Sequence, residues 1–328
     1  MTKYPDFESL PTVEGQPQGN AWGLWGRTDE LGTLNLLTPD VIVRAAKEVR
    51  VGKPIQLDLR LDHFGHGIAG RERFKQTIID FKERNKGTEY EFVAHDDVIA
   101  FNTQSSSQWD GFRHVGLQRS QVYYNGVKHR HIDEQGDGKL GIHKWVENGG
   151  IVGRGILLDY YRWRQQTSQE VAKADSSFSI TVAELEQVAK HQNLELQTGD
   201  ILIIRSGFTV WHDSVEPQER QRALDAGVFI GVESSLESAK WLWNHHFAAV
   251  AGDTLGFEVS PPPLGVEGRT CLHEWLLPHW GCPIGELWDL ETLSKECEKH
   301  GRWSFFFTSA PLNVFGGVGS PPNAIAIL

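Results

Sequence analysis

The sequence contains little cysteine. Three cysteines occur among 328 residues, and no two of them form a C-x-x-C pair: Cys271, Cys282 and Cys297. A small, odd and widely spaced set excludes a disulfide framework and a zinc ribbon. Reduced thiols are the simplest account, and they are typical of proteins kept in a reducing cytoplasm. We therefore expect a cytoplasmic protein.

Long apolar runs are also missing. No stretch of about 18 apolar residues occurs, so the sequence predicts no membrane-spanning helix. The segment 1–20 is polar and rich in proline, glycine and acids, and it lacks the apolar core of a secretory signal. We expect neither a membrane partner nor an exported chain.

Basic residues are outnumbered by acidic ones. Lysine and arginine number 32 against 43 aspartates and glutamates, which gives a formal net charge of −11. Because a protein that binds a phosphate backbone needs a positive surface, this balance argues against a nucleic-acid partner. A small-molecule substrate is the partner that we expect.

Three common catalytic motifs are incomplete. The segment 205–207, Arg-Ser-Gly, lacks the first glycine of the G-x-S-x-G nucleophile elbow. The glycine-rich segment 316–319 precedes two prolines at 321–322, so no helix can follow to make it a phosphate loop. In the segment 273–279 the second histidine comes too late for H-E-x-x-H, and Pro278 would disturb the helix.

Alternating helix and strand signals predict an α/β fold. Thr38, followed by proline and an acid, is typical of a helix start, and Thr181 with Glu184 forms a capping box. Short apolar runs bounded by turn residues predict buried strands, and they lie at 151–160, 201–204 and 247–251. The repeated order of strand, helix and strand predicts a mixed layer architecture.

The domain organisation that we expect is simple. Residues 1–21 are predicted to form an extended arm, and residues 22–328 one α/β domain. Strict alternation predicts a strand over 55–61. The polar segment 62–86 is predicted to be a loop with a surface excursion that shapes the substrate pocket. Residues 90–103 are predicted to form two strands joined by a turn at His95–Asp97.

The stretch 101–114 carries the strongest chemical signal. It places Asp110 and His114 among small hydroxyl residues, two amides and Trp109. Asp110 could hold a metal or orient a base, and His114 could move a proton near neutral pH. The spacing alone favours a polar turn in which Asp110 caps a helix and His114 packs beside Trp109, because isolated D-x-x-x-H spacing is common.

The same stretch resembles the signature of the cyclase family, which includes bacterial kynurenine formamidase and isatin hydrolase and reads H-x-G-T-H-x-D-x-P-x-H. The aspartate of that signature falls on Asp110 and its last histidine on His114. Its first histidine falls on Gln104, its threonine on Ser107 and its second histidine on Gln108. In the family those two histidines bind the metal, so the resemblance implies a divergent member.

The resemblance extends over most of the chain in the right order. Residues 22–35 are similar to the amino-terminal sequence motif of the larger cyclase branch. Residues 150–159 resemble the central strand of the family. Residues 273–321 resemble its last third. This implies the family's swivelling β/β/α fold, as one domain with a mixed sheet and flanking helices, and a homodimer or homotetramer.

Two distant residues join the site through the resemblance. His273 matches the family's distal histidine, and Glu286 matches the glutamate that follows it. The implied metal ligands are Asp110, His273 and Glu286, with the amide oxygen of Gln108 assisting. Such ligands suit Zn²⁺ or Mn²⁺, and exchange of imidazole for amide favours the harder ion. The loss of two histidines also leaves a metal-free site open.

Substrate contacts are the remaining candidates. Trp25 and Trp109 are candidate walls for a flat, cyclic substrate. Gln104 and Ser107 are candidate polar contacts.

The sequence leaves three hypotheses for the function. The first is a metal-dependent hydrolase that opens a cyclic amide or lactone, or cleaves an aryl formamide, with His114 as general acid and base. The second is a metal-independent cyclase, dehydratase or isomerase that uses His114 and Asp110. The third is a ligand-binding protein without catalysis.

Overall fold

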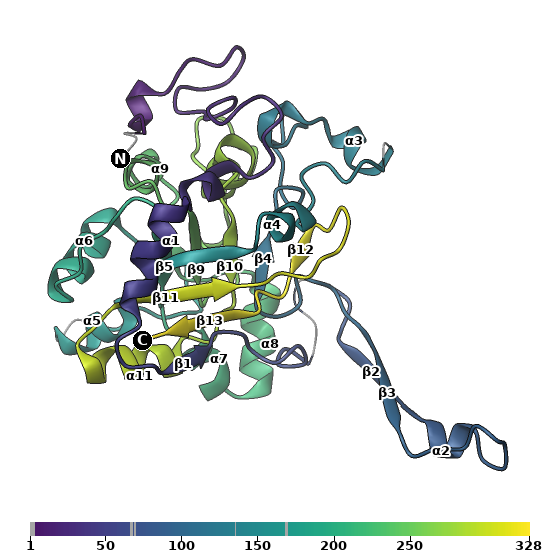
Figure 1. Cartoon of the computed structure of the whole chain (residues 1–328). Helices are drawn as coiled ribbons and strands as arrows, with labels where there is room; N and C mark the ends of the chain where they lie inside the picture. Colours follow the sequence, from purple (N-terminus) through teal and green to yellow (C-terminus); the bar gives the residue numbers. More distant parts are fainter. Residues whose placement is uncertain (1–3, 66–67, 69, 135, 168–169) are drawn as a thin grey trace.

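The protein is described by a computed structural model, in which residues 4–65, 68, 70–134, 136–167 and 170–328 are described. A mixed nine-stranded sheet runs through the centre of the domain (Figure 1). From edge to edge its strands are β1 (Pro54–Gln56), β13 (Ala324–Ile327), β11 (Ser304–Ser309), β5 (Ile151–Leu158), β7 (Ile201–Ile204), β9 (Ala249–Gly252), β10 (Ile284–Glu286), β4 (Gln108–Asp110) and β12 (Gly319–Ser320).

The middle of the sheet is parallel and its two flanks are antiparallel. Strands β5, β7, β9 and β10 pair in parallel, whereas β11 and β4 pair antiparallel to their neighbours on either side. Every residue of β7 and β9 is buried. Parallel strands are covered on both faces, which is why they read as continuous apolar runs. The three buried strands predicted from such runs are confirmed.

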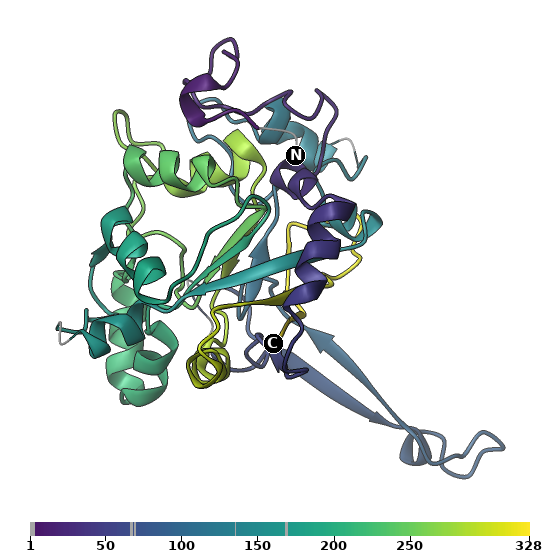
Figure 2. The same ribbon diagram turned by 60° about the vertical axis from the view of Figure 1, so that its left-hand side comes forward.

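Helices cover both faces of this sheet (Figure 2). Helix α1 packs on β5 and β11, and α6 packs on β5 and α9. The helices are α1 (Pro39–Ala45), α2 (Phe81–Arg84), α3 (His129–Glu134), α4 (His143–Glu147), α5 (Tyr160–Gln166), α6 (Val182–His191), α7 (Phe208–Ser214), α8 (Pro217–Ala226), α9 (Leu236–Asn244), α10 (Leu272–Glu274) and α11 (Glu291–His300). Within the described residues, none has the length and apolar character to cross a bilayer.

The two helix starts predicted from the sequence are confirmed. The hydroxyl of Thr38 accepts the amide proton of Val41 at the start of α1. At the start of α6 the Thr181 hydroxyl accepts the amide proton of Glu184, and the Glu184 carboxylate accepts the amide proton of Thr181, which completes a capping box. Such caps satisfy amide groups that the first turn of a helix leaves free, so short-range sequence is enough to specify them.

The amino-terminal segment lies against its own chain. The Phe7 ring is buried and contacts Trp275 and Trp280 in η5 (Trp275–Trp280). The Phe7 amide donates to Asn244 at 2.7 Å, and the Trp243 indole donates to the carbonyl of Pro5 at 2.9 Å. Of the arm predicted for residues 1–21, residues 1–3 lie outside the described part of the chain.

Three local predictions differ from the structure. The loop predicted for residues 62–86 contains β2 (Lys75–Asp80), which pairs antiparallel with β3 (His95–Ala100). His95–Asp97, predicted to be a turn, lies inside β3 because the turn spans the residues between the two strands, including α2. The hairpin projects from the domain (Figure 1) and is exposed along β3. The strand predicted for 55–61 is shorter, since β1 at the sheet edge ends at Gln56.

Burial in the parallel strands makes a direct stability prediction. Ile203 in β7 is fully buried, whereas Val43 on α1 is 62% exposed. We expect Ile203→Ala to lower the free energy of unfolding by about 2 to 5 kcal/mol, because it leaves a cavity in a packed core. The control change Val43→Ala should cost less than about 0.5 kcal/mol. Urea unfolding of both variants measures the difference, and equal losses would contradict this core.

Candidate active site

Strand β4 places its three side chains on two opposite faces. Successive side chains of a strand alternate, so Gln108 and Asp110 share one face and Trp109 takes the other. The Trp109 ring is fully buried, packs edge-on against Trp288 at 4.9 Å, and donates its indole proton to Ser309 Oγ at 2.9 Å. The expectation that Trp109 forms a wall of the substrate site does not fit this placement, because its ring belongs to the core.

Strand β10 brings Glu286 to the face that carries Asp110. The antiparallel register sets Glu286 opposite Gln108 and Ile284 opposite Asp110. The Gln108 amide nitrogen donates to Glu286 Oε2 at 2.6 Å. Residues separated by most of the chain therefore meet through one strand pairing.

His273 reaches the same cluster from α10. Its Nε2 lies 3.1 Å from Glu286 Oε1 and 3.7 Å from Asp110 Oδ2. Its Nδ1 lies 2.8 Å from Glu258 Oε1, and the same carboxylate accepts the backbone N–H groups of Leu272 and His273. Glu258 thus holds both the ring and the backbone around it. Sequence reasoning missed Glu258, which has no motif partner nearby.

His114 stands at the mouth of the cluster. Its Nε2 lies 3.8 Å from Asp110 Oδ2, and its side chain is partly exposed. A pocket of about 170 Å³ opens beside His114. Its lining includes His114, His273, Glu286, Arg71, Leu255, Pro262 and Leu264. Sequence reasoning did not single out Arg71, although it lies in the segment 62–86 that was expected to shape the substrate pocket.

Ser107 and Gln104 differ in their bonding. The Ser107 hydroxyl donates to the carbonyl of Leu287 and accepts the amide proton of Leu59 at 2.8 Å, so it ties two segments of the chain together. The Gln104 side-chain amide is buried and makes no hydrogen bond to the described residues. It approaches Gly319 so closely that a Cβ there would lie 2.3 Å from Gln104 Nε2.

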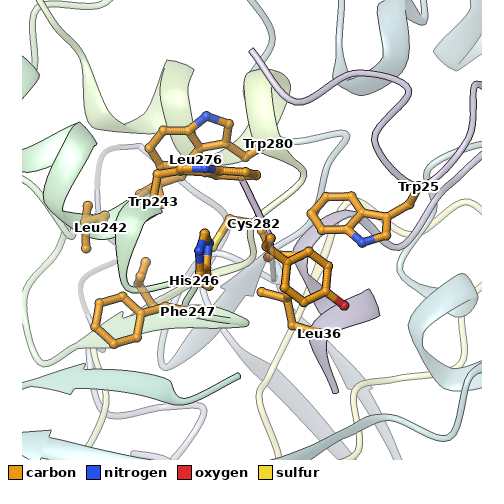
Figure 3. Close-up of a pocket in the computed structure, with 12 residues that line it drawn as sticks. Trp25, Leu36, Leu242, Trp243, His246, Phe247, Leu276, Trp280 and Cys282 are labelled. Atoms are coloured by element: carbon orange, nitrogen blue, oxygen red, sulfur yellow. The ribbon is translucent and has the colours of Figure 1, made fainter. Parts of the chain in front are cut away.

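Trp25 lies at a different place in the molecule. It lines an aromatic pocket with Trp243 and Trp280, as Figure 3 shows, and Tyr4 lines the same pocket. The cavity measures about 10 Å³, room for about one water molecule. The prediction that Trp25 forms a wall of the substrate site does not fit this placement, since its ring packs against Tyr4 in the amino-terminal segment and Trp243 in α9.

The charges of the cluster act strongly on one another. Burial favours the neutral form of each group, but the neighbouring His114 and His273 outweigh it and lower the pKa of Asp110. Burial and repulsion from Asp110 raise the pKa of Glu286. For His273, burial opposes the charged form, yet the neighbouring carboxylates of Asp110, Glu258 and Glu286 raise its pKa well above the ordinary value. The carboxylates thus require positive charge in their midst.

The cluster fits a divalent cation. Asp110, His273 and Glu286 are buried, and one donor atom from each lies within 4.8 Å of the others. Both Asp110 oxygens and the Gln108 amide oxygen are buried without a hydrogen-bond donor among the described residues. Unsatisfied buried acceptors are costly, and a cation would satisfy them together. Two carboxylates, an imidazole and an amide oxygen are a ligand set for Zn²⁺ or Mn²⁺.

The role of Glu258 can be measured on the metal-free protein. We expect Glu258→Gln to move the pKa of His273 back toward its ordinary value, because a negative charge 2.8 Å from Nδ1 is lost. Imidazole NMR titration reads this directly. Glu274→Gln is the matched control, since Glu274 hydrogen-bonds instead to the backbone of Gln118 and Gly265. An unchanged His273 titration in Glu258→Gln would refute this account.

Solved structures of other proteins superpose on most of this chain. A crystal structure of a novel cyclase superposes with a TM-score of 0.81 at 32% sequence identity, over 94% of this chain and 99% of that one. Isatin hydrolase A from Labrenzia aggregata, bound to benzyl benzoate, superposes with a TM-score of 0.56 at 14% identity, over 90% and 98%. Isatin hydrolase A from Ralstonia solanacearum gives 0.56 at 14%, over 88% and 97%.

The isatin hydrolases share the fold, and their low identity supports no more than that. No curated protein matches the chain. The family model "Cyclase: Putative cyclase" matches residues 35–259. Together with the first of these structures, this match confirms the family and the single α/β domain with a mixed sheet that the sequence predicted: the chain belongs to the cyclase family.

Proposed function

We propose that the protein is a metal-dependent hydrolase that opens a small cyclic amide or lactone, or cleaves an aryl formamide. One observation carries the proposal: buried donor atoms of Asp110, His273 and Glu286 converge beneath an opening that His114 flanks. Membership of the cyclase family supports an enzymatic role. The opening has room for a small molecule, and the excess of acids argues against a nucleic-acid substrate.

The floor of the site would hold the metal. Asp110, His273 and Glu286 supply the ligand atoms, and the free amide oxygen of Gln108 assists. A divalent ion there lowers the pKa of bound water and polarises a carbonyl group. Glu258 would accept a hydrogen bond from His273 Nδ1–H, which leaves the lone pair of Nε2 free to bind the metal beside Asp110 and Glu286.

His114 would move the proton. Hydrolysis adds the hydroxyl of water to the carbonyl carbon, breaks the bond to nitrogen or oxygen, and returns a proton to that leaving atom. His114 is suited to carry this proton, since its ring faces both the opening and Asp110. Arg71, which donates from Nη1 to the carbonyl of Gln104 at 3.0 Å, lines the same opening.

A metal-independent reaction is the second candidate. The Gln108 side-chain amide donates a hydrogen bond to Glu286 at 2.6 Å. An imidazolium at His273 would balance the charge of the carboxylates without a metal ion. The same pocket could then perform a cyclisation, dehydration or isomerisation with His114 and Asp110 as acid and base. Retention of turnover after complete removal of metal would favour this reaction.

Two substitutions test the hydrolase. We expect His114→Gln to lower kcat about 10²- to 10⁴-fold and to leave the bound metal unchanged, since His114 serves as a proton carrier. Asp110→Asn should lower both metal content and activity, because it weakens a ligand. Elemental analysis and a panel of lactones, cyclic amides and aryl formamides measure these effects.

Chelation and a matched variant complete that experiment. A chelator should abolish hydrolysis, and Zn²⁺ or Mn²⁺ should restore it. His191→Gln, an exposed histidine at the end of α6, should behave like the parent enzyme. Undiminished activity in both His114→Gln and Asp110→Asn would dismiss this assignment.

A homodimer or homotetramer is also proposed. Ile78, Val98 and Ile99 expose apolar surface on the projecting hairpin. An isolated two-stranded hairpin is marginally stable in water, so a second copy of the chain would stabilise it. Light scattering should give a multiple of the 36.9 kDa chain mass, whereas charged residues at Ile78 and Val98 should shift it toward one chain. A monomeric parent protein would rule this proposal out.

A further inference from the structure

We propose a second divalent-metal site, formed by His63, His212 and Asp213, which takes an ion of the Zn²⁺ class. His63 lies in the segment that leads to the hairpin, and the other two residues lie on α7. An ion held by all three would fasten that segment to the body of the domain. The proposal does not depend on the proposed function, because its ligands are separate from those around Asp110.

The spacing of the donor atoms suits a tetrahedral ion. Asp213 Oδ1 lies 3.0 Å from His63 Nε2 and 2.9 Å from His212 Nδ1. All three atoms lie within 4.8 Å of one another. A tetrahedral zinc with bonds of about 2.0 to 2.1 Å keeps its ligand atoms about 3.3 Å apart. Small side-chain adjustments therefore suffice for all three to bind.

One ring nitrogen in this cluster makes no hydrogen bond. His63 Nε2 is buried, and no residue that the structure describes forms a hydrogen bond with it. It lies 3.0 Å from Asp213 Oδ1, so the direction of the ring, rather than the distance, prevents the bond. A buried nitrogen without a hydrogen bond costs free energy, and a metal ion would bind its lone pair.

The rings are held in place before any ion binds. The Phe64 ring packs edge-on against His212 at 4.6 Å and against His63 at 4.9 Å. His212 is almost fully buried, which keeps its ring beside Asp213, whose Oδ1 lies 2.9 Å from His212 Nδ1. The Asp213 side chain is 52% exposed, which leaves room for water as the fourth ligand.

Two nearby charged residues of opposite sign interact electrostatically with the cluster. Asp289 interacts electrostatically with His63 and Asp213, whereas the positive charge of Arg220 acts on His212. Asp213 therefore remains the charged group in direct contact with both rings. A His₂Asp set with one position left for water is a ligand combination that suits zinc.

Zinc binding to purified protein tests the proposal. In an Asp110→Asn background, which weakens the first cluster, we expect His63→Gln and Asp213→Asn each to remove one equivalent of bound zinc. Affinity should fall more than about tenfold, since loss of even an outer-shell partner costs that much. Calorimetric titration with Zn²⁺ and elemental analysis after dialysis measure both quantities. Zinc should also raise the Tm of the background protein and not that of the double variants.

The controls separate this site from the first one and from misfolding. His63 and Asp213 are partly exposed, so their variants should keep the Tm of the background protein without zinc. His191→Gln in the same background should bind zinc like its parent. Equal zinc stoichiometry and affinity in the background and in both double variants would overturn the proposal. Complete absence of zinc binding by the Asp110→Asn protein would overturn it as well.

Discussion

Three carboxylates and one imidazole share a buried space at one end of the sheet. The rest of the site must compensate for this concentration of negative charge. A buried carboxylate is costly unless opposite charge or hydrogen-bond donors compensate it. Glu258 receives two backbone N–H groups, whereas Asp110 receives no hydrogen bond from the described residues. The cluster therefore requires a positive charge, which an imidazolium at His273 or a bound cation would supply. The metal proposal rests on this requirement.

The sheet makes such crowding possible. Strands β4 and β10 hold Gln108, Asp110 and Glu286 on one rigid face, so these side chains cannot move apart without breaking the strand pairing. The groups at the mouth come from elsewhere: His114 follows β4, and Arg71 lies in the segment before the hairpin. A rigid floor with a mouth built from connecting segments is a common arrangement, because loops can vary while the scaffold stays fixed.

Local sequence was a good guide wherever the cause of a structure is local. Thr38 and Thr181 cap their helices through groups three residues away, and the run Ile201–Ile204 is apolar because a parallel strand is covered on both faces. The hairpin escaped prediction because β2 and β3 are exposed and mostly polar, so no apolar alternation marks their pairing. Trp109 was misplaced for a related reason: the face that a strand residue takes depends on which strands pair with it.

What the sequence by itself determined was the type of each local element, the acidic balance of the chain and the motif that sets Asp110 four residues before His114. His273 and Glu286 entered only through resemblance to a family, and the structure brings both to Asp110. Tertiary structure alone decided that Glu258 supports His273, that Arg71 lines the opening, and that Trp25 lies in another pocket. The physical reason is that these contacts join residues far apart in the chain, and only the pairing and packing of the sheet set the distances between them.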